Sequence, residues 1–193
     1  MDKKPIKKDD WGIVLDYLAQ GLSSMARSEP IAQLVGDQFF SLLEVIVREE
    51  TTVSTGERVY IGDGKRDKVK YIRGRVEYGA LTASAKQELE LIVTEIVKKN
   101  VAPYLEFFNK SGSLSTRMHQ LELLPGIGKK HLWALLDARK ERLFESFEDI
   151  KSRVPLMPEP EKVVVRRVLA ELQDEDKYRI FVPRMEAEKE RRW

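Results

Sequence analysis

Short apolar runs separated by glycine-bearing turns occupy the first 80 residues of the chain. The segment Trp11–Leu18 mixes aromatic and β-branched residues over the length of a strand. The run Phe39–Val47 is apolar at nearly every position, which is typical of a buried central strand. A turn at residues 55–57 precedes a third short strand, Arg58–Ile61, whereas residues 31–35 are expected to form one helical turn. Short strands joined by such turns predict a small β-barrel or curled sheet.

Beyond residue 81 the apolar positions recur at spacings of three and four, as on one face of a long helix. These positions are Leu89, Ile92, Val93, Ile96 and Val97. Thr82 or Ser84 can cap the helix. Pro103 must break or kink it, so we expect one helix to about Asn100 and a second piece through Phe108.

A second pair of predicted helices flanks the turn Leu124–Lys130. Apolar residues recur at helical spacing on both sides of it: Leu114, Met118, Leu121 and Leu124 before, and Leu132, Leu135 and Leu136 after. Pro125 and Gly126 end the first helix, and Gly128 permits a tight turn into the second. A helix that opens just after a glycine directs free N–H groups and the positive end of its dipole outward, which suits one phosphate. The alternative is an αα-hairpin turn that needs glycine for its geometry alone.

The remaining pattern predicts two more helices and a strand. Ser146 can cap a helix, and the connector Pro155–Pro160 leads into another helix with an apolar face. The two would form a second, degenerate hairpin, whose connector lacks the glycines needed to hold a phosphate. Lys177–Val182 is predicted to be a strand that returns to the N-terminal sheet, followed by a charged tail.

Composition restricts the chemistry that the chain can carry. The net charge of its 193 residues is +2, so a nucleic-acid surface must be a local patch. The absence of cysteine excludes disulfides and thiolate catalysis, and two histidines make a zinc site of the usual kind unexpected. Neither a P-loop nor a hydrolase motif occurs, and no apolar run approaches the ~20 residues of a membrane span. We therefore expect a cytoplasmic protein that is not an enzyme and needs no cofactor or metal.

The strongest local excess of positive charge lies in residues 58–75. This segment holds seven basic and two acidic residues, a net charge of +5. Basic side chains interleaved with tyrosines suit a surface that neutralises phosphates and stacks bases. The candidate contacts are Lys65, Arg66, Tyr71, Arg73 and Arg75. The equally weighted alternative is a charge-rich sheet edge that prevents strand pairing, and the local structure reads either as a helical turn at 69–72 or as a strand at 73–78.

Residues 114–140 resemble the helix-hairpin-helix motif of nucleic-acid-binding proteins, on the sequence Leu-Pro-Gly-Ile-Gly-Lys-Lys. In that family the backbone amides of the hairpin hold a nucleic-acid phosphate without reading bases. The resemblance makes phosphate contacts of Gly126, Ile127, Gly128, Lys129 and Lys130, with the Ile127 side chain turned inward. Leu132 stands where the family usually has alanine, which would space the two helices slightly apart.

Taken whole, the chain resembles an uncharacterised archaeal family of predicted RNA-binding proteins. The resemblance implies an α+β protein with an OB-like β domain at 1–80, a connecting helix at 81–110, a helix-hairpin-helix domain at 111–175, and the return strand and tail at 176–193. It also implies a link with translation or ribosome biogenesis, with ribosomal or translation-associated proteins as further partners.

Three functions follow as hypotheses. The first is an RNA-binding protein in which the hairpin grips backbone phosphate and the basic segment supplies a second surface. The second is an accessory protein of DNA repair or recombination that grips duplex DNA. The third is a protein–protein assembly module in which the lysines are surface residues only.

Overall fold

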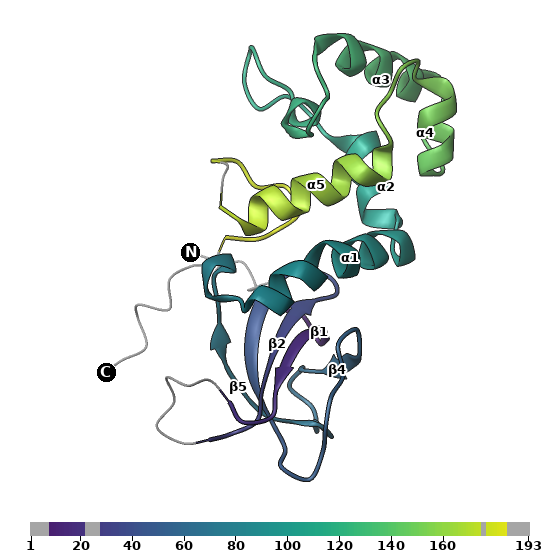
Figure 1. The fold of residues 1–193 in the computed structure, drawn as a ribbon. Helices are drawn as coiled ribbons and strands as arrows, with labels where there is room; N and C mark the ends of the chain where they lie inside the picture. Colours follow the sequence, from purple (N-terminus) through teal and green to yellow (C-terminus); the bar gives the residue numbers. More distant parts are fainter. Residues whose placement is uncertain (1–7, 22–27, 175–176, 185–193) are drawn as a thin grey trace, which may run out of the picture. The chain divides into compact units, whose positions relative to one another are not determined.

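The chain folds into two compact units in the computed structural model (Figure 1), which describes residues 8–21, 28–174 and 177–184. The first unit comprises Met1–Glu88 together with the chain from Glu171 onward. The second unit is the continuous stretch Leu89–Ala170. The fold is α+β, as predicted, with an antiparallel sheet and a set of helices.

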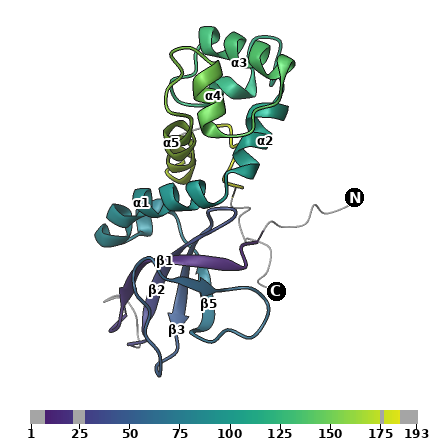
Figure 2. The same ribbon diagram turned by 90° about the vertical axis from the view of Figure 1, so that its right-hand side faces the viewer.

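The first unit is built on a five-stranded antiparallel sheet in the order β4-β1-β2-β3-β5. Its strands are β1 (Trp11–Leu18), β2 (Ile31–Gly36), β3 (Leu42–Val47), β4 (Arg58–Tyr60) and β5 (Val69–Arg75). The pairing shifts register in β1 between Val14 and Asp16, and twice along β3. Such bulges bend and twist strands, so the sheet curls into a half-barrel (Figure 2). Its edge strands are β4 and β5. The expected curled sheet is therefore confirmed.

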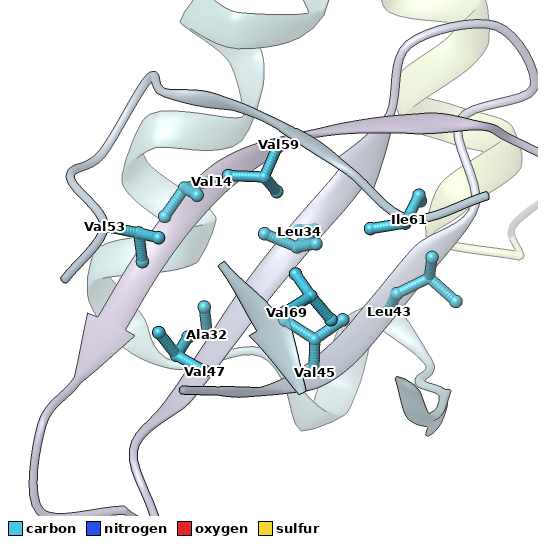
Figure 3. Close-up of a cluster of buried hydrophobic side chains, with 10 residues drawn as sticks. All are labelled: Val14, Ala32, Leu34, Leu43, Val45, Val47, Val53, Val59, Ile61 and Val69. Atoms are coloured by element: carbon cyan, nitrogen blue, oxygen red, sulfur yellow. The ribbon is translucent and has the colours of Figure 1, made fainter. Parts of the chain in front are cut away.

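Aliphatic side chains on the concave face of this sheet form its core. Figure 3 shows ten of them converging from the strands and from the segments flanking β4. They are Val14, Ala32, Leu34, Leu43, Val45, Val47, Val53, Val59, Ile61 and Val69. Alternate positions along β2 and β3 supply this face, as the two-residue period of a strand requires.

The predicted helical turn at residues 31–35 is wrong, because this segment is β2. All six residues of β2 are buried, so its apolar side chains follow no clear alternation and their spacing also fits a helix. Pairing with β1 on one side and β3 on the other determines the strand. On the outer face of β2, the Gln33 amide donates to the Glu44 carboxylate at 2.9 Å and to the Ala80 carbonyl at 3.2 Å.

The strand predicted from Phe39 begins three residues later, at Leu42. The backbone N–H groups of Gln38 and Phe39 donate to the carboxylate of Asp9, at 2.9 and 2.7 Å, and Phe40 has a positive φ of 56°. These bonds form a turn before the strand. The segment that read either as helix or as strand is β5.

The helices are α1 (Ala83–Lys99), α2 (Ala102–Lys110), α3 (Lys129–Glu141), α4 (Phe147–Arg153) and α5 (Pro160–Leu172). The Thr82 hydroxyl accepts the Ala85 N–H at 3.0 Å and so caps α1. The break that Pro103 predicts falls between α1 and α2, with the proline in the first turn of α2. The Ser146 hydroxyl caps α4, as predicted, by accepting the Asp149 N–H at 3.0 Å.

Two predicted elements are absent from the described chain. Residues 114–119 are not helical: Leu114 donates its N–H to the Met118 carbonyl at 2.8 Å, and a short 3₁₀ helix, η2 (Gln120–Leu123), follows. Residues 177–184 form no strand, and the rest of the predicted tail lies outside the described residues. The Glu171 carboxylate accepts the N–H groups of Ile180, Phe181 and Val182 at 2.7–2.9 Å, so these donors cannot pair with a sheet edge.

Candidate nucleic-acid interface

The turn Leu124–Ile127 precedes α3 and has the features of a type II β-turn. The Ile127 N–H donates to the Leu124 carbonyl at 3.1 Å. Pro125 takes the second position, and Gly126 the third with φ of +83°. A Cβ on Gly126 would also lie 3.4 Å from Pro158 of the connector between α4 and α5. The proline and the first glycine are therefore explained by the turn, which is the part of the motif that needs no ligand.

Gly128 is the N-cap of α3, and no side chain caps the helix there. Its carbonyl accepts the Leu132 N–H at 2.9 Å, which is the first hydrogen bond of the helix. The N–H groups of the first turn, from Lys129 onward, consequently lack intrahelical acceptors. A Cβ built on Gly128 would meet no atom within 4 Å, so no other group packs against this residue at the start of the helix. The geometry provides the free backbone donors that the sequence predicts.

Ile127 points inward, as predicted. Its side chain is buried, as are those of Leu121, Leu124 and Leu132. Ile127 therefore offers a ligand its backbone only. The predicted helix before the turn is the short η2, so the surroundings of the turn differ from a pair of full-length helices.

The two lysines after the turn have different environments. The Lys129 ammonium donates to the Arg117 carbonyl at 3.0 Å and lies 2.8 Å from the Glu122 carboxylate. Lys130 is exposed and forms no ion pair with any residue that the structure describes. Lys130 is therefore the cation of this turn that a ligand could pair with, whereas the charge of Lys129 is already balanced by Glu122.

A histidine for which the sequence indicated no specific role organises the segment before the turn. His119 Nδ1 accepts the Leu121 N–H at 3.1 Å, and the Glu122 carboxylate accepts the His119 N–H at 2.8 Å. Together they form a capping box on η2. Burial, helped by the nearby Arg139 guanidinium, lowers the pKa of His119 from its ordinary value of 6.5. The spacing of His119 and Glu122 is that of a capping box, and this signal could have identified it.

The lowered pKa of His119 predicts a loss of stability in mild acid. A group whose pKa is lower in the folded protein disfavours the native state once the unfolded chain can bind the proton. The contribution of neutral His119 is thus present above pH 6.5 and lost as pH falls below it. Thermal unfolding of His119→Asn, which keeps a capping acceptor, should show a weaker dependence on pH just below 6.5 than the wild type.

His131→Asn is the control, because it removes the other histidine and leaves the capping box intact. This variant should retain the dependence of thermal stability on pH that the wild type shows just below 6.5. The Lys129 ammonium lowers the pKa of the Glu122 carboxyl below its ordinary 4.5. The stability that is lost when this carboxylate is protonated is therefore lost at lower pH, apart from the effect of His119. An identical pH dependence in wild type and His119→Asn would contradict the assignment.

The predicted second hairpin, α4 with α5, packs its connector against the first. The His131 ring N–H at Nε2 donates to the Leu156 carbonyl at 3.0 Å. The buried Arg167 of α5 donates to the Leu123 carbonyl at 2.9 Å. The second hairpin therefore contacts the motif on both sides of the turn, through its connector at His131 and through α5 at Leu123.

Most of the basic residues of segment 58–75 are paired with acids from elsewhere in the chain. The ion pairs are Arg58–Asp37 at 2.7 Å, Lys68–Glu57 at 2.6 Å, Lys70–Glu29 at 3.2 Å and Arg73–Glu44 at 2.6 Å. The exposed Tyr71 donates its hydroxyl to Glu29 at 3.1 Å, and partial desolvation, helped by this contact, raises the pKa of Tyr71. The local charge excess is thus much smaller in the fold than in the sequence.

The other candidate residues of this segment lie in the loop before β5 and at its end. Lys65 is exposed, whereas Arg66 is half-buried and donates its Nε–H to the Gly62 carbonyl at 2.8 Å. Arg75 is half-buried and ends β5. Sequence reasoning missed the Trp11–Tyr60 edge-to-face pair, 5.1 Å between ring centres, and the Arg58 guanidinium 4.2 Å above the Trp11 ring. The turn before α3 belongs to the second unit and the basic segment to the first.

No group of three or more histidine, aspartate or glutamate side chains is placed to hold a metal ion in the parts of the chain that the structure covers. None of the described helices is long and apolar enough to cross a membrane.

The architecture defines an α+β protein with a curled five-stranded sheet in one unit and a helical second unit. Residues 8–183 match the family described as "Protein of unknown function (DUF655)". The chain belongs to this family.

Two relatives agree with the match. "Uncharacterized protein MJ0038" of Methanocaldococcus jannaschii is 41% identical over 181 residues, which cover 93% of this chain and 82% of the relative. The crystal structure of Af1531 from Archaeoglobus fulgidus, a member of the same family, is similar with a TM-score of 0.83 and 44% identity, covering 91% of this chain and all of that one. The expected archaeal family is thus confirmed, while the functions attached to it in the sequence analysis stay predictions.

Proposed function

We propose that this protein binds nucleic acid, with RNA preferred, by gripping a backbone phosphate at the first turn of α3 through a helix-hairpin-helix. The observation that carries the proposal is the charge of that turn. It contains Lys129, Lys130 and His131, no acidic residue, and no side-chain cap.

This arrangement opposes the usual preference of a helix. The N-terminus carries the positive end of the dipole, where an acid stabilises and a cation destabilises by about 0.3–1 kcal/mol. Helix α3 places Lys130 there without an acid paired to it among the described residues, whereas Lys129 is balanced by Glu122, and a bound anion would convert the cost of Lys130 into attraction. A phosphate that accepts the free amides and pairs with Lys130 would do so.

The five-stranded curled sheet supports binding of an oligonucleotide, because small five-stranded sheets of OB type bind such ligands. The preference for RNA follows from the family resemblance. The ion pairs of the basic segment predict that its contribution is the smaller one. Lys65 is exposed in the loop between β4 and β5 and forms no ion pair with a described residue, so it is the cation of this segment best placed to meet a ligand. A role in translation or ribosome biogenesis is part of the same proposal.

The test is a set of titrations with single-stranded RNA, structured RNA and duplex DNA across a salt series, on the wild type and Lys130→Glu. The variant should bind every ligand about tenfold more weakly, and its salt slope should fall by about 0.7–0.9 for the lost phosphate contact. Because glutamate suits a helix N-terminus, its thermal stability should stay equal or rise by about 0.5 kcal/mol. A loss of binding without a loss of stability would be specific to the site.

Lys140→Glu is a matched control, since it makes the same change in net charge on the same helix. Lys140 is exposed in the last turn of α3, about 15 Å along the axis from Lys130. The affinity of Lys140→Glu for each nucleic acid should stay within a factor of about two of that of the wild type. Equal affinity of Lys130→Glu and wild type would refute the phosphate grip, and tighter binding of duplex DNA at equal salt would favour the repair or recombination function.

A protein–protein assembly module is the second candidate, because several leucines of the helical unit are largely exposed, among them Leu91 of α1 at 61%. Leu156 of the connector between α4 and α5 is 80% exposed, and Leu143, just after α3, is 57% exposed. The absence of measurable binding to all three nucleic acids by the wild type would leave this candidate as the better one.

A further inference from the structure

Trp133 has the most exposed aromatic side chain among the residues that the structure describes. It lies on α3 and is 60% exposed. No ring contact, cation–π contact or hydrogen bond joins it to any other residue that the structure describes. Trp11, by comparison, is 36% exposed and packs against Tyr60 and Arg58. The indole of Trp133 thus offers ring faces and an N–H that the described fold does not use.

The helix geometry places this indole beside the turn that precedes α3. Trp133 follows Lys129 by four residues and Lys130 by three, so the three share one face of the helix. Side chains on a helix lean toward its N-terminus, and the surface that Trp133 covers is therefore the first turn itself. One helical turn, ~5 Å, separates the aromatic position from the free amides.

The charges around Trp133 favour an anionic partner. The first turn carries only basic side chains. Asp137, one turn further along the same face, is 3.1 Å from the Lys140 ammonium and is thus paired. A single exposed tryptophan on its own needs no explanation, but here it adjoins uncapped amides and an unpaired lysine.

We propose that Trp133 stacks on an unpaired base of the nucleotide next to the phosphate held at α3, so that single-stranded nucleic acid is the preferred ligand. This proposal rests on the proposed function and adds the substrate class. Every base has a π-face, so stacking selects for accessibility of the base and is tolerant of its identity. In a blunt duplex the bases are already stacked and paired, so the indole gains nothing there.

The test compares a short single-stranded RNA with the blunt duplex of the same sequence. Trp133→Ala should weaken single-strand binding roughly tenfold or more and should leave duplex binding within a factor of about two. Trp133→Phe keeps a ring and should retain most of the affinity. Stacking should also quench tryptophan fluorescence of the wild type, and this quenching should be lost in Trp133→Phe although the RNA still binds.

Leu143→Ala is the control for loss of an exposed apolar group from the other end of α3, and it should bind both ligands as the wild type does. Equal losses for single strand and duplex in Trp133→Ala, or no loss for either, would overturn the stacking proposal. If Lys130→Glu still weakens binding in that case, the phosphate grip survives it. If the wild type binds neither the single-stranded RNA nor the duplex, both the stacking proposal and the phosphate grip are overturned.

Discussion

Glu171→Ala should lower the free energy of unfolding of the first unit by on the order of 4 kcal/mol. The Glu171 side chain is 1% exposed and lies in the last turn of α5. Its carboxylate accepts three consecutive N–H groups, those of Ile180, Phe181 and Val182. Alanine would leave all three donors without this acceptor and would open a space beside the buried Val182.

Trypsin provides a direct readout of the same change. Lys177, Arg179 and Arg184 flank the segment held by Glu171, so its release should expose them to cleavage in the variant before the rest of the chain is cut. Glu171→Gln keeps one oxygen that can accept up to two of the three N–H groups and should be intermediate. Cleavage of Glu171→Ala at the wild-type rate would show that other contacts hold the segment.

Arg139→Met should destabilise the second unit by about 2–4 kcal/mol. The Arg139 guanidinium, on α3, donates to the Phe108 and Ser111 carbonyls at the C-terminal end of α2, each at 2.9 Å. Methionine has a similar length but no donor, so these carbonyls would lose their partner in a partly buried place. Chemical denaturation and hydrogen exchange of the last α2 amides measure the effect.

The same variant couples to the pH dependence of His119. The Arg139 guanidinium is one cause of the lowered pKa of His119, after burial. Removing that charge should raise the pKa of His119 toward its ordinary value, and NMR titration of the ring would show this directly. Arg139→Lys keeps a positive charge but cannot reproduce both carbonyl bonds, so it should lose stability while the His119 pKa stays low. A pKa that moves equally in both variants would contradict the electrostatic cause.

Sequence reasoning was most successful where one periodicity dominated. The residues at β1, β3 and β4, and the break between α1 and α2, followed from apolar runs and from Pro103. It failed at β2, because this run is short and interrupted by Gln33, so the spacing of its apolar residues also fits a helical turn. It failed also at 114–119, where apolar residues at helical spacing are joined by a polar loop whose Ser113 pairs with His119.

Only part of the candidate site, likewise, could be predicted from the sequence. The turn with Gly126 and Gly128 was predictable, because a positive φ and a helix start without a side-chain cap are both typical of glycine. The neutralisation of the basic segment was not, because Asp37, Glu29 and Glu44 approach it only through the sheet pairing and the loops. Trp133 could have been found, since the apolar spacing of Leu132 and Leu135 already places it on the outer face of the helix.

The division of the first unit between both ends of the chain has a consequence for synthesis. During translation the sheet-forming residues 1–88 leave the ribosome first, and the whole helical unit follows before Glu171 emerges. The three N–H groups that Glu171 binds come later still. The first unit can therefore complete its last contacts only after the second unit has been made, so a chain stalled or truncated before Glu171 would expose an unfinished β domain to chaperones and proteases.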